Sequence, residues 1–432
     1  MIWNKEMETM SRKQTEELQL EHLKQVVSHC YNNVPFYHQR LDEAGVTPEK
    51  IKTLSDVQYI PFTTKEDIRD NYPYGLFAVP MKKIVRIHAS SGTTGKPTVV
   101  GYTRKDLDTW SELIARLVTA AGCTEEDVAQ ICFGYGLFTG ALGLHYGLEK
   151  IGAAVVPISS GNTKKQLMVM KDFGTTTIIS TPSYALYMGE QARELGYKKE
   201  DFKLRIGLFG SEGSSVEMRS QIEELWGLLA TDNYGLSEVM GPGVSGDCHL
   251  REGMHIAEDH FLTELIDPKT GTVLPVGETG ELVITTLTKE GIPLLRYRTK
   301  DITRFNTEPC GCGRTSMRMD KIKGRTDDML KIRGVNVFPT QIESVLMNIE
   351  KIGPHYELIV RRDGYMDTLE VKVEVIDGSL LERYRELERL QADIRENLKS
   401  VLGIICKVTL AEPKSITRYE GKAKRIVDLR NQ

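Results

Sequence analysis

The chain has 432 residues, of which 40% are hydrophobic and 27% charged, a composition typical of a globular protein with two or more domains. Its formal net charge of -4 gives no electrostatic attraction for nucleic acid or an anionic membrane, and no apolar run reaches membrane-spanning length. The N-terminus lacks the apolar core of a signal peptide and the seven cysteines are odd in number, so we expect reduced thiols in a cytoplasmic protein.

The first segment is predicted to be helical up to about residue 50. Leu23, Val26 and Val27 are among the apolar residues spaced for one buried face. Further along, Thr63 and Thr64 can cap a helix that begins near Lys65.

The stretch SSGTTGKPTVVGYT, residues 90–103, is typical of a loop that binds a polyphosphate. Its glycines let backbone N–H groups face an anion, its hydroxyls donate hydrogen bonds, and its lysine adds a point charge. The residues concerned are Ser91, Gly92, Thr93, Thr94, Gly95 and Lys96. It differs from a Walker A loop because only two residues separate its glycines and a proline follows the lysine, while the flanks alternate like strands. We therefore expect a loop between two strands; a plain Gly/Ser linker is the alternative.

Between residues 104 and 232, short apolar runs alternate with helix-length segments. VAQICF, AAVVPI, TTIIS and RIGLFG are the apolar runs, and the pattern predicts a parallel sheet with helices on its faces. Ligands of such sheets gather where strands end in glycine-rich turns. FGYGLFTGALG, FGSEGSS and DNYGLSEVMGPG are three such turns.

The rest of the chain divides into a β-rich segment and a smaller α+β unit. Turns such as DPKTG and PVGETGE punctuate residues 255–305. Beyond Asp327 the pattern predicts helices and strands of one small domain. Its longest helix, within 380–402, is expected to bury one apolar stripe. That stripe consists of Leu380, Tyr384, Leu387, Ile394, Leu398 and Val401. The fold class is thus α/β, with an N-terminal domain of residues 1–326 and a C-terminal α+β domain of residues 327–432.

Cysteine and histidine residues cluster in GDCHLREGMH and in the CGCG turn. Two clusters of soft ligands suggest a structural zinc site, which needs four N or S ligands and no open position. Cys248, His255, Cys310 and Cys312 are the predicted ligands, with His249 as an alternate fourth. Free thiols in a loop are the alternative.

Several stretches in this order resemble the adenylate-forming enzymes, which include acyl-CoA synthetases, luciferases and peptide-synthetase adenylation domains. They are SSGTTGKP, YGLSE, YRTKD, GRTDDMLKIRG and the terminal EGKAKR, and they span nearly the whole chain. Within that superfamily, PFTTKEDIRDNYP, YGLFTG and DDMLKIRGVNVFPTQIE are similar to the phenylacetate-CoA ligase branch.

The resemblance implies a two-step ligation. A carboxylic acid, an arylacetic acid such as phenylacetate, would react with ATP to give an acyl adenylate and pyrophosphate, and the thiol of coenzyme A would then displace AMP. An adenylyltransferase that passes AMP to another acceptor is the alternative, and a nucleotide-binding protein without catalysis is a third. The oligomeric state stays open, with a homodimer as one option.

Roles for the nucleotide-binding residues also follow from the resemblance. Thr93, Thr94 and Lys96 would hold the β- and γ-phosphates. Ser237 would touch the α-phosphate, and Glu238 would bind Mg²⁺, a hard cation suited to a carboxylate. Asp301 would accept hydrogen bonds from the ribose hydroxyls, and Arg325 would contact ribose or phosphate. The adenine would be bordered by Ser211, Glu212, Asp232, Asn233 and Tyr234, and Gly235 belongs to the same nucleotide-binding set. Lys300 stands where many members have glycine, which we expect to alter local backbone freedom. Lys65 is a weaker candidate for phosphate contact.

Lys422, in EGKAKR, corresponds to the lysine of the small domain that reaches the α-phosphate and carboxylate oxygens during adenylation. A rotation of that domain at a hinge, Asp327, would exchange this lysine for a thiol channel in the second step.

For the acyl pocket, the turn after one sheet strand supplies Tyr135, Gly136, Phe138, Gly140 and Ala141. Tyr135 and Phe138 could pack on an aromatic ring. Relatives acting on phenylacetate tend to have a second glycine at the position of Ala141, and Ala-Glu-Pro-Trp at 211–214. The particular aryl acid therefore stays open.

Overall fold

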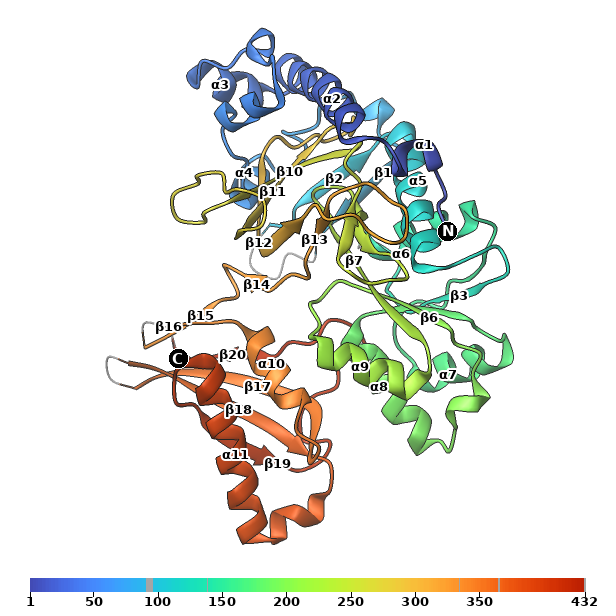
Figure 1. The fold of residues 1–432 in the computed structure, drawn as a ribbon, viewed down its shortest axis with the longest axis vertical. Coiled ribbons are helices and arrows are strands. Elements are labelled where there is room, and N and C mark those ends of the chain that lie inside the picture. Colours follow the sequence, from blue (N-terminus) through green and yellow to red (C-terminus); the bar gives the residue numbers. More distant parts are fainter. Residues whose placement is uncertain (91–95, 138, 334, 364–365, 431–432) are drawn as a thin grey trace.

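A computed structural model describes every residue except 91–95, 138, 334, 364–365 and 431–432. Two lobes are visible in Figure 1. The large lobe extends through β14 (Gly324–Arg325), and the small lobe begins with β15 (Leu330–Ile332). Within the described residues, none of the helices has the length and apolar character needed to cross a membrane.

The N-terminal helices cover one end of the large lobe. They are α1 (Lys5–Glu8), α2 (Arg12–Asn33) and α3 (Pro35–Glu43). Leu23, Val26 and Val27 are buried, as their spacing predicted. The helix α4 (Lys65–Asp70) begins where expected, because the Thr64 hydroxyl accepts a hydrogen bond from the Asp67 N–H at 3.2 Å.

The predicted strands around the glycine-threonine stretch are present. β1 (Arg86–Ala89) and β2 (Val99–Tyr102) pair antiparallel, with Arg86 opposite Tyr102. Residues 91–95, between these two strands in the sequence, lie outside the described residues. The phosphate loop expected there therefore stays a prediction.

The alternating segment forms parallel strands with helices between them, which confirms the βαβ prediction. Each strand lies beside its neighbours in the order β4-β3-β5-β6-β7, all parallel. The strands are β3 (Val128–Ile131), β4 (Ala154–Val156), β5 (Thr177–Ser180), β6 (Ile206–Phe209) and β7 (Leu229–Leu236). The helices are α5 (Arg104–Ala121), α6 (Gly140–Lys150), α7 (Thr163–Asp172), α8 (Pro182–Glu194) and α9 (Val216–Trp226).

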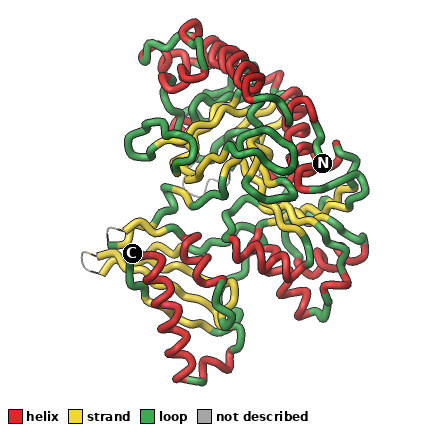
Figure 2. The backbone as a smooth tube through the Cα atoms, viewed as in Figure 1, coloured by secondary structure: helices red, strands yellow, loops and turns green. Residues whose placement is uncertain are grey.

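The β-rich segment continues the same sheet with antiparallel strands. β7 pairs with β8, and the order runs onward as β9-β13-β12-β11-β10, with β14 paired to β12. Figure 2 shows the strands of both lobes in yellow. These strands are β8 (Gly241–Asp247), β9 (Met254–Ile256), β10 (Phe261–Ile266), β11 (Thr279–Thr286), β12 (Tyr297–Asn306) and β13 (Arg318–Met319). β7 belongs to both halves, because it pairs with β6 on one side and with β8 on the other.

The small lobe is a four-stranded sheet with helices packed on it, which confirms the α+β prediction. Its order is β19-β18-β17-β20. The strands are β17 (Ile352–Asp363), β18 (Met366–Val375), β19 (Lys407–Ala411) and β20 (Ile426–Asp428); a short pair, β15 and β16 (Val335–Val337), precedes them. The helices are α10 (Pro339–Met347) and α11 (Tyr384–Leu402).

The predicted buried stripe of α11 was partly wrong. Ile394 and Leu398 are buried, but Tyr384 and Val401 are exposed, at 70% and 51%. Leu390 and Leu402 are buried in the same helix. The helix begins only at Tyr384, and the buried leucines and isoleucine recur every four residues, at 390, 394, 398 and 402, which places them on one face of the helix.

Candidate functional site

A cleft of about 700 Å³ lies where the two lobes meet. Its walls come from the turn after β6, from the end of β7, from β12 and β14, and from the small-lobe segment before β20. The predicted residues on these walls are Ser211, Glu212, Asp232, Asn233, Tyr234, Gly235, Asp301, Arg325 and Lys422. They come from five separate stretches of sequence, so the fold brings most of the predicted nucleotide set into one cavity.

Asp301 is held from two sides in the wall of this cleft. The phenol of Tyr234 donates to Asp301 Oδ2 at 2.6 Å, and Arg325 Nη1 lies 3.0 Å from Oδ1. Arg325 faces Asp301 directly because β14 pairs with β12 at these two residues. Burial raises the pKa of Asp301 above its ordinary value, and the Arg325 guanidinium opposes that rise. The carboxylate is therefore a fixed acceptor.

Lys300, just before Asp301, has the backbone conformation that glycine favours. Its φ is +68°, in the left-handed region. The sequence predicted altered backbone freedom here. In the structure, Lys300 has a strained left-handed backbone conformation, and the contacts of Asp301 with Tyr234 and Arg325 are present.

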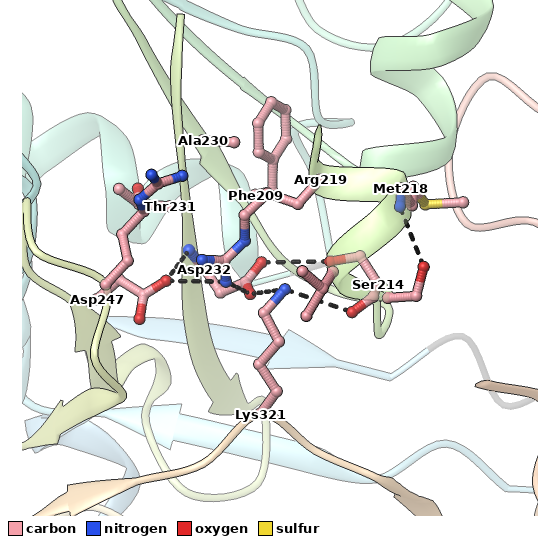
Figure 3. A network of polar contacts seen from close by, with 12 residues as sticks. Phe209, Ser214, Met218, Arg219, Ala230, Thr231, Asp232, Asp247 and Lys321 are labelled. Carbon is pink, nitrogen blue, oxygen red and sulfur yellow. Dashed lines mark hydrogen bonds and ion pairs between the residues drawn. The ribbon is translucent and has the colours of Figure 1, made fainter. Parts of the chain in front are cut away.

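Asp232 belongs to a network of charged groups on another wall of the cleft (Figure 3). Its carboxylate pairs with Arg219 and, at 2.8 Å, with Lys321 Nζ. Asp247 Oδ2 accepts from the Asp232 N–H at 3.0 Å and from Arg219 at 3.1 Å. Asn233 donates from Nδ2 to the Phe209 carbonyl at 2.8 Å. Asp232 is thus occupied by two cations, and its contribution to an adenine site would come mainly through the backbone it fixes.

Lys422 lines the small-lobe side of the cleft. The side chain is exposed, and it has no hydrogen-bond or ion-pair partner among the residues that the structure describes. Its neighbours along the chain are tied to the large lobe, since the Ala423 N–H donates to Glu212 Oε2 at 3.0 Å. Lys422 therefore lines the cavity with an exposed side chain, while the backbone next to it is held.

The described residues among those predicted for phosphates and Mg²⁺ are not part of the lining of this cleft. Glu238 is buried, with Thr98 Oγ1 at 3.4 Å and Lys65 Nζ at 3.5 Å from its Oε1. The Ser237 and Thr139 hydroxyls are 2.8 Å apart. Lys96 is exposed, with Nζ 5.6 Å from the centre of the Tyr72 ring. The remaining members of this set lie outside the described residues; they are Ser91, Gly92, Thr93, Thr94 and Gly95.

The predicted acyl-pocket residues lie at the start of α6 and in the turn before it. The phenol of Tyr135 is 3.1 Å from His145 Nδ1, and Gly136 has a φ of +139°. Gly140 and Ala141 are buried in the first turn of α6. Phe138 lies outside the described residues, and of the four others none lines the interlobe cleft.

Asp327, the predicted hinge, follows β14 where the chain passes from the large to the small lobe. Arg325 binds its carboxylate with two nitrogens, Nε at 2.8 Å and Nη2 at 3.0 Å. The same guanidinium contacts Asp301, so the hinge region and the fixed carboxylate of the cleft share one arginine.

The four predicted zinc ligands converge. The ligand atoms of Cys248, His255, Cys310 and Cys312 all lie within 4.8 Å of one another. The two sulfurs of Cys248 and Cys310 are 3.8 Å apart, and Cys312 Sγ is 3.3 Å from His255 Nε2. The alternate ligand His249 is exposed and outside this group. The other cysteines, Cys30, Cys123, Cys132 and Cys406, are buried.

Three residues of the cleft had no assigned role in the sequence analysis. Arg425 lies over the Tyr356 ring, 4.2 Å from its centre, and pairs with Glu343. Arg425 belongs to the EGKAKR stretch, and its position in that motif could have identified it as a residue of the cleft. Glu343 and Tyr356 occur in ordinary helix and strand patterns, which carry no such signal.

Comparison with known proteins agrees with this geometry. The family model described as AMP-binding enzyme matches residues 15–288, and that of the AMP-binding enzyme C-terminal domain matches residues 334–430. The chain belongs to the AMP-binding enzyme family. Two curated members are the phenylacetate-coenzyme A ligases of Thermus thermophilus and Escherichia coli. The first is 48% identical over 100% of both chains, and the second 49% identical over 98% of this chain and 97% of its own.

Two solved structures of a 2-hydroxyisobutyryl-CoA ligase match this chain to different degrees. The 2-hydroxyisobutyryl-CoA ligase in its postadenylation state, with 2-HIB-AMP, has a TM-score of 0.94 at 28% identity, covering 99% of this chain and 92% of its own. The same ligase in its thioesterification state, with 2-HIB-AMP and CoA, has a TM-score of 0.74 at 29% identity, covering 100% and 93%. Over nearly its whole length, the present chain thus matches the postadenylation structure of that ligase more closely than the thioesterification structure.

Proposed function

We propose that this protein is an ATP-dependent acid-thiol ligase that joins an arylacetic acid, phenylacetate foremost, to coenzyme A. The observation that carries the proposal is identity of 48–49% over essentially the full length to two phenylacetate-coenzyme A ligases. The interlobe cleft agrees with it, because Lys422 from the small lobe and Asp301 from the large lobe face one cavity.

The first half-reaction would form the acyl adenylate. An oxygen of the acid attacks the α-phosphorus of ATP, the bond to the bridging oxygen breaks, and pyrophosphate leaves. Lys422 would offset the repulsion between the two anions as they approach. Asp301, fixed by Tyr234 and Arg325, would accept hydrogen bonds from the ribose hydroxyls. Binding both reactants in one cleft also removes the entropic cost of their encounter.

The second half-reaction would form the thioester. The thiolate of coenzyme A attacks the carbonyl carbon, and the bond to the adenylate oxygen breaks, so that AMP leaves with the electron pair. Lys422 has no part in this step, so the small lobe would turn about Asp327 to admit the thiol. We accordingly divide the chain into residues 1–326 and 327–432, a boundary consistent with the C-terminal family model that starts at 334.

We assign Glu238 as the Mg²⁺ ligand. A buried carboxylate next to the Thr98 hydroxyl offers the oxygen donors that a hard cation prefers. When bound, Mg²⁺ supplies charge neutralisation for the phosphates. Thr93, Thr94, Lys96 and Ser237 would bind the phosphate oxygens, and Tyr135, Gly136, Phe138, Gly140 and Ala141 would border the acyl group.

We further propose a structural Zn²⁺ held by Cys248, His255, Cys310 and Cys312. For Zn–S bonds of about 2.3 Å in a tetrahedron, sulfurs lie about 3.8 Å apart, which matches the 3.8 Å between Cys248 and Cys310. The Ser316 hydroxyl lies 3.2 Å from His255 Nδ1, which leaves Nε2 for the metal. Burial raises the pKa of Cys248 to about 12.

Acid-dependent exchange of labelled pyrophosphate into ATP tests the proposed function. A panel of phenylacetate, hydroxyphenylacetate, indoleacetate and benzoate should show strongest exchange with phenylacetate, and coenzyme A should be consumed in step with AMP release. AMP transfer without consumption of thiol would instead identify an adenylyltransferase. A lack of exchange with every acid would contradict both. The cytoplasmic location and a homodimer stay predictions from the sequence.

A further inference from the structure

Glu212 joins the two lobes through both oxygens of one carboxylate. It lies in the turn after β6, in the large lobe. Oε1 accepts the Ser183 N–H at 2.8 Å, in the first turn of α8, and Oε2 accepts the Ala423 N–H at 3.0 Å, in the small lobe. The sequence placed Glu212 at the adenine, but the structure gives its carboxylate these two partners.

The Ala423 contact is one of three that bracket Lys422. Thr181 Oγ1 donates to the Gly421 carbonyl at 3.1 Å, and the Thr163 hydroxyl is 3.2 Å from Glu420 Oε1. Residues on both sides of Lys422 are therefore bound to the large lobe while the lysine side chain itself is left to the cleft. A backbone fixed at the preceding and following residues restricts where the ammonium can lie.

A carboxylate is the group that suits this position. Two N–H donors from different lobes converge on it, and an ionised carboxylate offers only acceptors, one oxygen for each. One donor also belongs to the N-terminus of the 13-residue helix α8, where a negative charge is favoured. A neutral amide of the same shape would turn an NH₂ group toward one of the two donors.

We infer that Glu212 is a positioning residue for adenylation: it holds the Lys422 segment against the large lobe and must release Ala423 before the thiol can enter. The inference rests on the proposed two-step function. On this inference, the Glu212 contact with Ala423 stabilises the arrangement of the two lobes seen here, in a chain that matches the postadenylation structure of the 2-hydroxyisobutyryl-CoA ligase.

The test is Glu212→Gln, measured in both half-reactions. Acid-dependent pyrophosphate exchange should fall about tenfold or more, as expected for loss of a charge-assisted hydrogen bond. Thioester formation from supplied phenylacetyl adenylate and coenzyme A should stay within about twofold of wild type, because the contact is broken in that step. Equal loss in both half-reactions, or no loss in either, would overturn the inference.

A matched control is Glu190→Gln. Glu190 also bridges the lobes, from α8 to His355 at 2.7 Å and Arg418 at 3.5 Å, but it contacts no residue of 420–423. Its variant should keep pyrophosphate exchange within about twofold, since it loosens the interface without freeing Lys422. If it lowers exchange as much as Glu212→Gln, the effect belongs to the interface as a whole and Glu212 has no special role.

Amide hydrogen exchange of the substrate-free protein separates this inference from the proposed function. The peptide that contains Ala423 should exchange faster in Glu212→Gln than in wild type, and equal rates would overturn the inference whatever acid the enzyme uses. Absence of pyrophosphate exchange in the wild type would count against the proposed function alone. Should Glu212→Gln fail to fold, Ala423→Pro removes the donor from the other side, with the same expected outcomes.

Discussion

The two walls of the interlobe cleft hold their functional groups in different ways. On the large-lobe wall, Asp301 is buried and bound by Tyr234 and Arg325, both within 3.0 Å. On the small-lobe wall, the Lys422 side chain is exposed, and its segment is attached to the large lobe by hydrogen bonds such as that from Ala423 to Glu212. The first arrangement suits a group needed throughout a reaction, and the second suits a group that must leave between steps.

Lys422→Ala should give the largest effect, because it removes the cation from the small-lobe wall of the cleft. Adenylation should fall about 10²–10³-fold, because one cation aimed at developing charge is worth that much in a preorganised site. Thioester formation from supplied acyl adenylate should be largely spared. Pyrophosphate exchange and single-turnover thioester assays measure the two. Comparable loss of both would show that Lys422 acts throughout the reaction and that the small lobe does not exchange it.

Asp301→Asn changes the large-lobe wall of the cleft and should have a smaller effect, which is expected in both half-reactions. The substitution removes a buried charge opposite Arg325, and loss of charge-assisted bonds to a ribose costs about 1.5–3 kcal/mol, or about tenfold to a hundredfold in ATP affinity. ATP titration and the thioester assay should both show the loss, since the nucleotide is bound in each step. Unchanged ATP affinity would remove Asp301 from the nucleotide site.

Metal removal tests a part of the large lobe that we expect to take no part in either step. Stoichiometric zinc should be found in protein purified without added metal, and Cys310→Ser should lose it with a lower melting temperature. Both half-reactions, assayed well below that temperature, should change little. Zinc near zero, with Cys310 and Cys312 alkylated freely, would end the proposal.

The sequence predicted the parts of the fold and cleft that local pattern or motif encodes. The βαβ rhythm, the Thr64 cap and the convergence of Cys248 with Cys310 all follow from residue type and spacing. The Glu212 bridge could not be predicted, because its partners are backbone N–H groups, which every residue but proline has. The burial of α11 was misjudged since Tyr384 and Val401 share the helical period with residues that do face the sheet.

Lys300→Gly should give the smallest effect. It tests whether the backbone conformation of residue 300 helps to set the position of Asp301. Glycine removes the left-handed strain at φ +68°, but it adds unfolded-state entropy, so the net gain in stability should be at most about 1 kcal/mol, or a rise of about 2 °C in melting temperature. ATP affinity should stay within about twofold, because Tyr234 and Arg325 still fix the carboxylate. Lys300→Ala, which keeps the strain and removes the same charge, is the control and should bring no rise in melting temperature. A marked loss of ATP affinity in the glycine variant alone would mean that the strained lysine backbone, rather than the two side-chain contacts, sets the position of Asp301.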